Sequence, residues 1–325
     1  MAATYAIGIA IVIWVARGIS AAQLAHDLMQ ARMSIFIPVC LGSVVIWVVG
    51  DTWLYSRLFS YFKIPSGFRE MLPALIAHEF FQAVNGVAAG TAVVTMVHRR
   101  KHVDFISAGA ILMFQGVIDL QVVGLMALAA SLAAPRSIPE LSLGAAALFL
   151  GASCAFALLW FFGSRLPVAR WAHIGPLFAV LRRARVSDCV KLAAIRGAVF
   201  AAQGAILYLE LVSFQISVPL QLVMAALPVV LIAGALPIVP SGLGPRQAAI
   251  VAIFSDFGSR ASLLTMALAH TGLVMVVRAA LGLFSTDLIA REVFASKPQP
   301  QGSAEINAKR LAQEPECKKI QQRRV

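Results

Sequence analysis

Charged residues are scarce in this chain of 325 residues, where they make up 13% of the sequence against 60% hydrophobic residues. A soluble protein of ordinary composition carries about 25% charged residues, so a water-soluble globular domain is a poor interpretation. The apolar residues also gather in blocks of about 20 or more, the length that crosses a hydrocarbon core of ~30 Å. The composition therefore predicts a membrane protein with several spans.

Motifs of soluble enzymes are missing as well. The sequence has no GxSxG, HExxH, Walker or GxGxxG motif, so we predict no enzyme activity and no cofactor, and direct use of ATP is excluded. Its few cysteines are far apart and show no CxxC or Cys–His spacing, which predicts neither a metal site nor a disulfide framework. These cysteines are Cys40, Cys154, Cys189 and Cys317.

The net charge of +12 arises from basic residues that lie mainly between the apolar blocks and near the C-terminal end. This is the pattern of the positive-inside rule, so we expect no nucleic-acid partner. We predict a multi-pass protein of the cytoplasmic (inner) membrane with both termini cytoplasmic. Residues 291–325 are polar and basic, which predicts a disordered cytoplasmic tail.

The apolar blocks decide the expected spans. The first block precedes its first basic residue, Arg17, so we interpret it as an uncleaved helix rather than a signal peptide. The blocks are Ala2–Ala16, Ser34–Leu54, Leu72–Val97, Phe105–Ala134, Leu141–Phe162, Leu192–Phe214, Pro219–Val239 and Ser262–Ile289. The mixed basic and apolar stretch between residues 162 and 192 is typical of a segment at the membrane surface.

The third block, Leu72–Val97, has basic residues on both flanks and is interrupted by Asn85-Gly86 and Gly90. Each arm then has about 12–13 residues and reaches roughly two-thirds of the way across the core. We predict a re-entrant hairpin that enters from the cytoplasmic side. One long tilted helix with a tolerated glycine is the alternative.

A second interruption follows residue 236, where three prolines, Pro237, Pro240 and Pro245, rule out a continuous helix. We predict a second hairpin, which enters from the opposite side. The expected fold is an all-α polytopic membrane protein with about six full transmembrane helices and two re-entrant helical hairpins, within a transmembrane domain of residues 1–290. Opposed hairpins suggest an inverted repeat with halves 1–134 and 141–290.

The stretch LPIVPSGLGPRQAA, residues 236–249, carries the most chemistry. Gly242 and Gly244 allow backbone conformations closed to other residues, and Pro245 suits the first position of a helix. A helix N-terminus offers free N–H groups, and Arg246 beside it could bind a phosphate through two hydrogen bonds. A plain turn with a snorkelling arginine is the alternative.

Ionisable residues within apolar blocks are costly, which makes each of them a candidate for a site. Glu79 and Asp119 could pair with Arg196, Arg246 or Arg278, and the sequence leaves the pairing open. Acidic residues near the block ends, which we expect at the interface, are Asp51, Glu210 and Asp287. The candidates within blocks are His78, Glu79, Asp119, Arg196, His270 and Arg278.

The chain resembles the transmembrane region of bacterial lysylphosphatidylglycerol synthases and related flippase-like membrane proteins, over roughly residues 34–284. The stretch at 236–249 is similar to the family's Pro-Ile…Gly-Leu-Gly…Arg-Glu signature, with Gln247 in place of the acidic residue. Asn85–Gly90 and FQGVIDL, residues 114–120, resemble two further family segments but lack several of their charged residues. The synthases carry a separate aminoacyl-transfer domain, and we expect no such transfer from this chain.

The resemblance implies movement of a phospholipid or lipid-linked headgroup between leaflets. We expect Arg246 and the helix after Gly244 to hold the phosphate, and Asp119 to hold Arg246 or Arg278 in place. Two alternatives stay open: a non-transporting membrane subunit of a lipid-modifying or glycosyl-transferring enzyme, and a small-solute secondary transporter. The expected lipid contacts are Gln82, Asn85, Asp119, Gly242, Gly244, Arg246 and Gln247, and the expected charge partners are Glu79, Arg196, His270 and Arg278.

Overall fold

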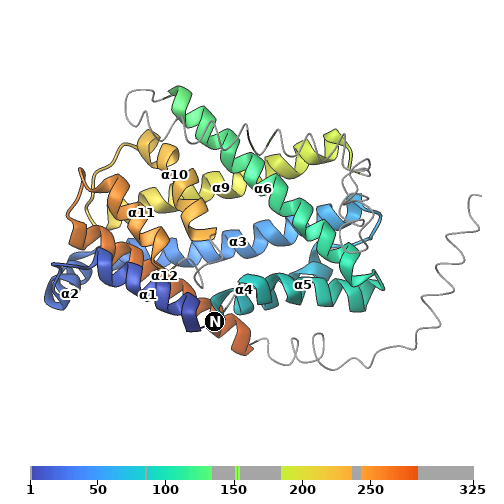
Figure 1. Ribbon diagram of the computed structural model, residues 1–325, viewed down its shortest axis with the longest axis horizontal. Helices are drawn as coiled ribbons and strands as arrows, with labels where there is room; N and C mark the ends of the chain where they lie inside the picture. The colour runs from blue at the N-terminus through green and yellow to red at the C-terminus, as the bar shows by residue number, and fades with distance from the viewer. Residues whose placement is uncertain are drawn as a thin grey trace, which may run out of the picture.

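The computed structural model describes residues 2–84, 86–133, 151, 153, 184–235 and 243–284. Within these ranges the protein is helical, with no strand (Figure 1). The helices are α1 (Ala2–Val15), α2 (Ala21–Gln30), α3 (Met33–Tyr61), α4 (Phe68–Val84), α5 (Gly86–Lys101), α6 (Phe105–Ala133), α9 (Val186–Ser213), α10 (Leu220–Ala235), α11 (Pro245–Phe254) and α12 (Arg260–Phe284).

The protein is an all-helical polytopic membrane protein, as the sequence predicts. Four helices of the described part are long and apolar enough to cross a membrane: Met33–Tyr61, Phe105–Ala130, Val186–Ser213 and Arg260–Leu283. Of the two other expected spans, the first is the 14-residue α1. The other, Leu141–Phe162, lies outside the described residues, as do the 291–325 tail, Asp287 and most of the 162–192 segment.

The helix break predicted near Asn85 is present. α4 has 17 residues and α5 has 16, and only residue 85 separates them. Lys101 Nζ, at the end of α5, lies 2.7 Å from Glu70 Oε2 in the first turn of α4. The chain therefore reverses direction between α4 and α5, which form a helical hairpin rather than one long helix.

The second break is also present. α10 ends at Ala235, α11 begins at Pro245, and the two helices pack against each other. Pro245 occupies the first helical position, as predicted, and Gly244 before it has φ +104°. Only glycine adopts that backbone conformation without strain, so the sequence Gly-Pro fixes where α11 starts.

The order long–short–short–long occurs twice in the described chain, as α3–α6 and as α9–α12. α3 runs through the middle of the bundle and packs against both α9 and α4 (Figure 1). One apolar core joins α3 to α4, α5 and α6, for example through Phe59 and Phe114. A second joins α9 to α10, α11 and α12, for example through Leu211 and Phe254. The inverted repeat itself stays a prediction.

Glycines allow close contact at two helix crossings. A Cβ at Gly50 of α3 would lie 2.5 Å from Val199 Cγ2 of α9, and a Cβ at Gly282 of α12 would lie inside the ring of Phe80 on α4. Both contacts are shorter than carbon atoms tolerate, so a larger residue would force the facing side chain or the helix itself to shift. These two crossings bring polar residues of neighbouring helices within reach of each other.

α2 is an addition that the apolar blocks do not reveal. Its start is a capping box, in which Ser20 Oγ accepts a hydrogen bond from Gln23 N at 3.2 Å and Gln23 Oε1 accepts one from Ser20 N at 2.9 Å. Such reciprocal bonds satisfy N–H groups that a helix start leaves open. α2 packs against α12, so it belongs to the periphery of the bundle.

Candidate functional site

Among the residues that the structure describes, three charged clusters lie inside the helical bundle, and each holds one arginine. The first joins α3, α6 and α9. Arg196 Nη1 lies 2.6 Å from Asp51 Oδ1, and Arg196 Nε lies 2.6 Å from Asp119 Oδ1. The guanidinium also lies over the rings of Trp47, at 5.7 Å, and Phe200, at 5.4 Å.

This first cluster contains two carboxylates and one cation, and its two acids differ in exposure. The side chain of Asp51 is 8% exposed and that of Asp119 is 32% exposed. Gln115 Nε2 donates a hydrogen bond of 2.5 Å to Asp119. With both carboxyls ionised, the three charged groups would carry one negative charge in excess.

The second cluster joins α3, α9, α11 and α12 around His270. Arg246 Nη1 lies 3.0 Å from His270 Nε2, and His270 Nδ1 lies 2.5 Å from Glu210 Oε1. An arginine side chain has donors only, so Nε2 must accept and Nδ1 must carry the ring proton. The ring is therefore neutral and donates to Glu210. Arg246 is linked to this carboxylate only through the His270 ring, and not by a direct contact.

Cys40 completes this cluster, because its thiol donates to Glu210 Oε1 at 3.7 Å and also lies 3.7 Å from His270 Nδ1. The sulfur, carboxylate and ring nitrogen all lie within 4.8 Å of one another, a spacing that a metal ion could use. However, the tautomer set by Arg246 places a proton on Nδ1, which leaves no lone pair for a metal there. We interpret the group as a hydrogen-bonded relay that holds Arg246.

The third cluster joins α4 to α12. Arg278 Nε lies 2.7 Å from Glu79 Oε2, and His78 Nδ1 lies 3.5 Å from Glu79 Oε1. Arg278 lies one turn before Gly282, and Glu79 directly precedes Phe80, so the glycine crossing of α12 and α4 brings this pair together.

The start of α11 has the local structure that the sequence predicts, and its role in holding a phosphate stays a prediction. Arg246 lies in the first turn of α11 and is half-buried. Gln247, fully buried, accepts a hydrogen bond of 2.6 Å from Gly244 N and donates one of 2.9 Å to Thr271 Oγ1. Both polar atoms of its amide are thus used within the protein, and we assign Gln247 the task of fixing the start of α11 rather than contacting lipid.

Three expectations from the sequence need correction. Asp119 pairs with Arg196, not with Arg246 or Arg278. Asp51 and Glu210 are 5% and 1% exposed as whole residues, so they are buried members of clusters and not interfacial residues. The other expected lipid contacts are not contradicted by the structure. Gln82 is half-buried in the last turn of α4, and Asn85 and Gly242 lie outside the described residues.

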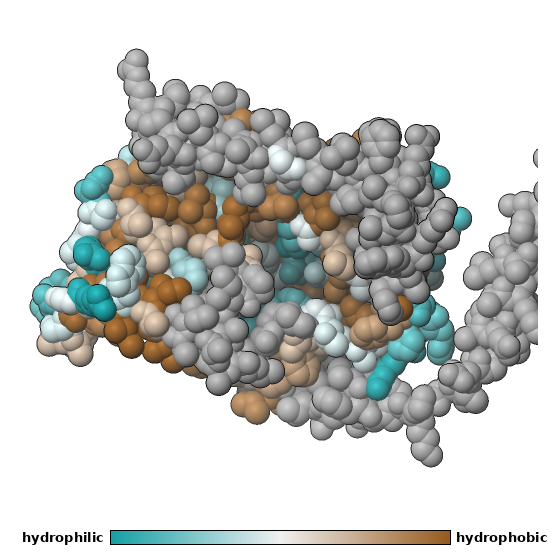
Figure 2. Space-filling view, in the orientation of Figure 1, coloured by the Kyte–Doolittle hydropathy of each residue, from teal (hydrophilic) through white to brown (hydrophobic). Residues whose placement is uncertain are grey.

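The surface of the bundle is consistent with a polar interior. Figure 2 shows a hollow in the middle of one face, with hydrophilic residues on its floor and hydrophobic residues along part of its rim. A polar hollow next to apolar surface is unusual for a pure membrane anchor, because polar groups in hydrocarbon are costly.

A family model described as the lysylphosphatidylglycerol synthase TM region matches residues 1–282. The chain belongs to this family. Membership in the lysylphosphatidylglycerol synthase TM region family confirms the resemblance in the sequence and makes the chain a multi-pass membrane protein of a lipid-related family. A comparison with curated proteins gave no match.

Proposed function

We propose that this protein moves a phospholipid or lipid-linked headgroup between the leaflets of the cytoplasmic membrane. One observation carries the proposal: Arg246 stands half-buried at the start of a short helix inside a membrane bundle, held by a neutral histidine. A carboxylate in direct contact would balance the charge of the guanidinium and occupy its donors. Among the described residues Arg246 instead contacts the neutral ring of His270, and Glu210 lies one hydrogen bond further away, which leaves the other guanidinium donors for an anionic ligand.

The first turn of α11 adds to this attraction. The first hydrogen bond of α11 runs from Ala248 N to Gly244 O, so the N–H groups of Arg246 and Gln247 have no acceptor within the helix. The helix dipole places positive charge at the same end. A phosphate bound here would accept hydrogen bonds from the backbone and from the guanidinium together. A headgroup that crosses the bilayer unaided faces a large desolvation cost, which such a site lowers.

The two helical hairpins support the same proposal. In our proposal α4–α5 and α10–α11 enter the membrane from opposite sides, with both termini cytoplasmic, and the lipid moves without any bond being made or broken. Non-helical backbone at membrane depth is tolerated only where protein or a polar cavity surrounds it. The start of α11, where Gln247 donates a hydrogen bond to Thr271 of α12, fits that condition.

A vesicle assay tests the proposal. The purified protein is reconstituted with phosphatidylglycerol that carries a fluorescent acyl chain, and a membrane-impermeant reductant removes the label from the outer leaflet. We expect protein-containing vesicles to lose the inner-leaflet label as well. Arg246→Gln should return this loss to the protein-free rate, while Arg260→Gln, which removes an exposed arginine at the start of α12, should leave it unchanged.

Two results would count against the proposal. Wild-type vesicles that lose label no faster than protein-free vesicles would remove lipid movement as the function. Equal rates for wild type and Arg246→Gln would remove Arg246 from the site. Arg246→Lys keeps the charge but loses the two-pronged hydrogen bond, and we expect an intermediate rate.

A further inference from the structure

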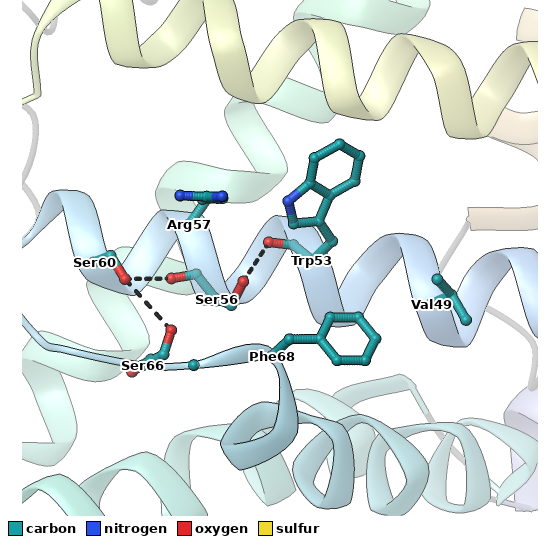
Figure 3. A pocket seen from close by; sticks show the side chains of 8 residues that line it. Val49, Trp53, Ser56, Arg57, Ser60, Ser66 and Phe68 are labelled. Atoms are coloured by element: carbon teal, nitrogen blue, oxygen red, sulfur yellow. Dashed lines mark hydrogen bonds between the residues drawn. The ribbon is translucent and has the colours of Figure 1, made fainter.

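Polar sites apart from Arg246 differ in what they leave unsatisfied. A cavity of about 520 Å³ at the C-terminal end of α3 is lined in part by Ser56 and Ser60 (Figure 3). Both hydroxyls already donate to carbonyl oxygens of α3, at 2.7 Å, so they do not point to a ligand. The cluster around Arg196 is different, because a buried acceptor and a negative charge are left without a partner there.

The unpartnered acceptor belongs to Gln115 of α6. This residue is 1% exposed, and its Oε1 is buried without a hydrogen bond from any described residue. Nε2 of the same amide donates to Asp119 Oδ1, one turn further along the helix. A buried acceptor without a donor is costly, so a donor is missing directly beside the Asp119 carboxyl.

The charges of the cluster are unbalanced as well. Asp51 and Asp119 both contact one guanidinium, that of Arg196, at 2.6 Å. The described helices packed against α6 add no second cation: α3 adds the neutral phenol of Tyr55, α10 has no titratable residue, and those of α5 lie in its last turn, near the start of α6. With both carboxyls ionised, one buried negative charge lacks a counter-charge, which is costly.

A single proton on Asp119 would remove both deficits. Oδ1 already accepts hydrogen bonds from Arg196 Nε and Gln115 Nε2, which leaves Oδ2 for the proton. A carboxylic acid has one donor beside one acceptor, and an amide has the complementary pair. The Asp119 hydroxyl would donate to Gln115 Oε1 while Gln115 Nε2 still donates to Oδ1. The cluster would then be neutral overall.

Asp119 is also the acid of this cluster that water can reach. Its side chain is 32% exposed, against 8% for Asp51. α6 is long and apolar enough to cross a membrane, and acids at such positions are typical of proton relays. A metal cation bound here would lie beside the guanidinium of Arg196 and be repelled by it. A proton leaves a neutral acid and avoids that repulsion.

We propose that Asp119 binds a proton, paired with Gln115, and that this proton is taken up and released as lipid moves. Proton binding at Asp119 stands by itself, whereas its coupling to transport rests on the proposed function. Lipid movement would then respond to a pH difference across the membrane.

Infrared difference spectroscopy tests proton binding in the full-length protein, purified in a maltoside detergent. A protonated carboxyl gives a C=O band apart from the amide bands, and ordinary aspartates stay ionised between about pH 6 and about pH 8. We expect a band at about pH 6 in wild type that weakens toward about pH 8. It should be lost in Asp119→Asn and kept in Asp256→Asn, which removes an exposed carboxylate. Gln115→Leu should move it to higher frequency, because the carbonyl loses the hydrogen bond from Nε2.

The contrary outcomes are equally distinct. No band in wild type, or an unchanged band in Asp119→Asn or in Gln115→Leu, would overturn proton binding. Wild type grown with aspartate that carries heavy carbon in its side-chain carboxyl should show the band at lower frequency, which keeps the test open if Asp119→Asn does not fold. A band at the unlabelled frequency would assign the proton to a glutamate and overturn the proposal.

The vesicle assay of lipid movement tests the coupling, with the external pH fixed so that the reductant behaves alike. We expect an imposed pH difference to change the rate of label loss in wild type several-fold, and a protonophore to abolish the change. Asp119→Asn should show no response to the pH difference. Equal wild-type rates with and without the pH difference would overturn the coupling. If wild type moves no lipid, the proposed function fails and the coupling with it, while the infrared band still decides proton binding.

Discussion

The cluster around Arg196 makes a quantitative prediction, because it joins two acids to one base. Arg196→Met would leave Asp51 and Asp119 without their cation, and Asp51 is almost fully buried. Removing one partner of a buried ion pair typically costs about 3–5 kcal/mol. We therefore expect Arg196→Met to destabilise the protein by about that amount.

Asp119→Asn should behave differently. It removes the excess negative charge, leaves the pair of Arg196 with Asp51 intact, and affects a side chain that is 32% exposed. We expect a cost below about 1 kcal/mol, the range of partly exposed ion pairs. Substituting Asp51 by Asn in the Arg196→Met background should restore part of the lost stability, because the orphaned buried carboxylate disappears.

Thermal unfolding in detergent, followed by tryptophan fluorescence, measures these differences. At about 2 °C per kcal/mol, the scale for large domains, Arg196→Met should lower the apparent Tm by roughly 6–10 °C and Asp119→Asn by about 2 °C or less. Equal losses for the two variants would refute the charge count. A double variant that is no more stable than Arg196→Met would refute the claim that Asp51 is left unpaired.

Three further predictions follow from other contacts. Gly282→Ala places a methyl group in the Phe80 ring, so it should lower the apparent Tm by several degrees, whereas Ala at Gly272, where nothing lies within 4 Å, should not. His270→Leu breaks the link from Glu210 to Arg246. It should slow lipid movement in vesicles even when the rate is compared at equal amounts of folded protein. The pKa of Glu70 is held below its ordinary value, first by the hydrogen bond from Lys101. The stabilisation from this pair should therefore be complete at pH values above the ordinary pKa of glutamate. It should be lost as the pH falls through the lowered pKa. Acid unfolding scans of wild type and Glu70→Gln should converge at low pH.

Several features were predictable from local sequence alone. Asn85-Gly86 and the Gly244-Pro245 pair break helices for reasons of backbone chemistry, and both breaks appear where expected. The costly charges inside apolar blocks also proved to be interior residues, because a polar group in hydrocarbon needs a partner wherever the fold places it. The sequence analysis did not predict α2, although the capping-box spacing of Ser20 and Gln23 marks its start.

The pairing of charges was not predictable, since it depends on which helices cross. Asp51 seemed close to the end of its apolar block, but α3 continues to Tyr61, which places Asp51 in the interior. Glu210 lies near the end of α9, yet it is buried and its hydrogen-bond partner is His270, 60 residues further along the chain. No local pattern in the sequence records such a contact.

The glycine crossings have a consequence for mutational screens. Gly50 and Gly282 have no side chain that a lipid could touch, yet larger residues there would separate Asp51 from Arg196 and Glu79 from Arg278. In a saturation screen for transport, both glycines would score as though they lined the substrate path. Measuring cellular protein levels in parallel would identify them as helix-packing positions, because substitutions there would lower the amount of folded protein rather than the activity of each molecule.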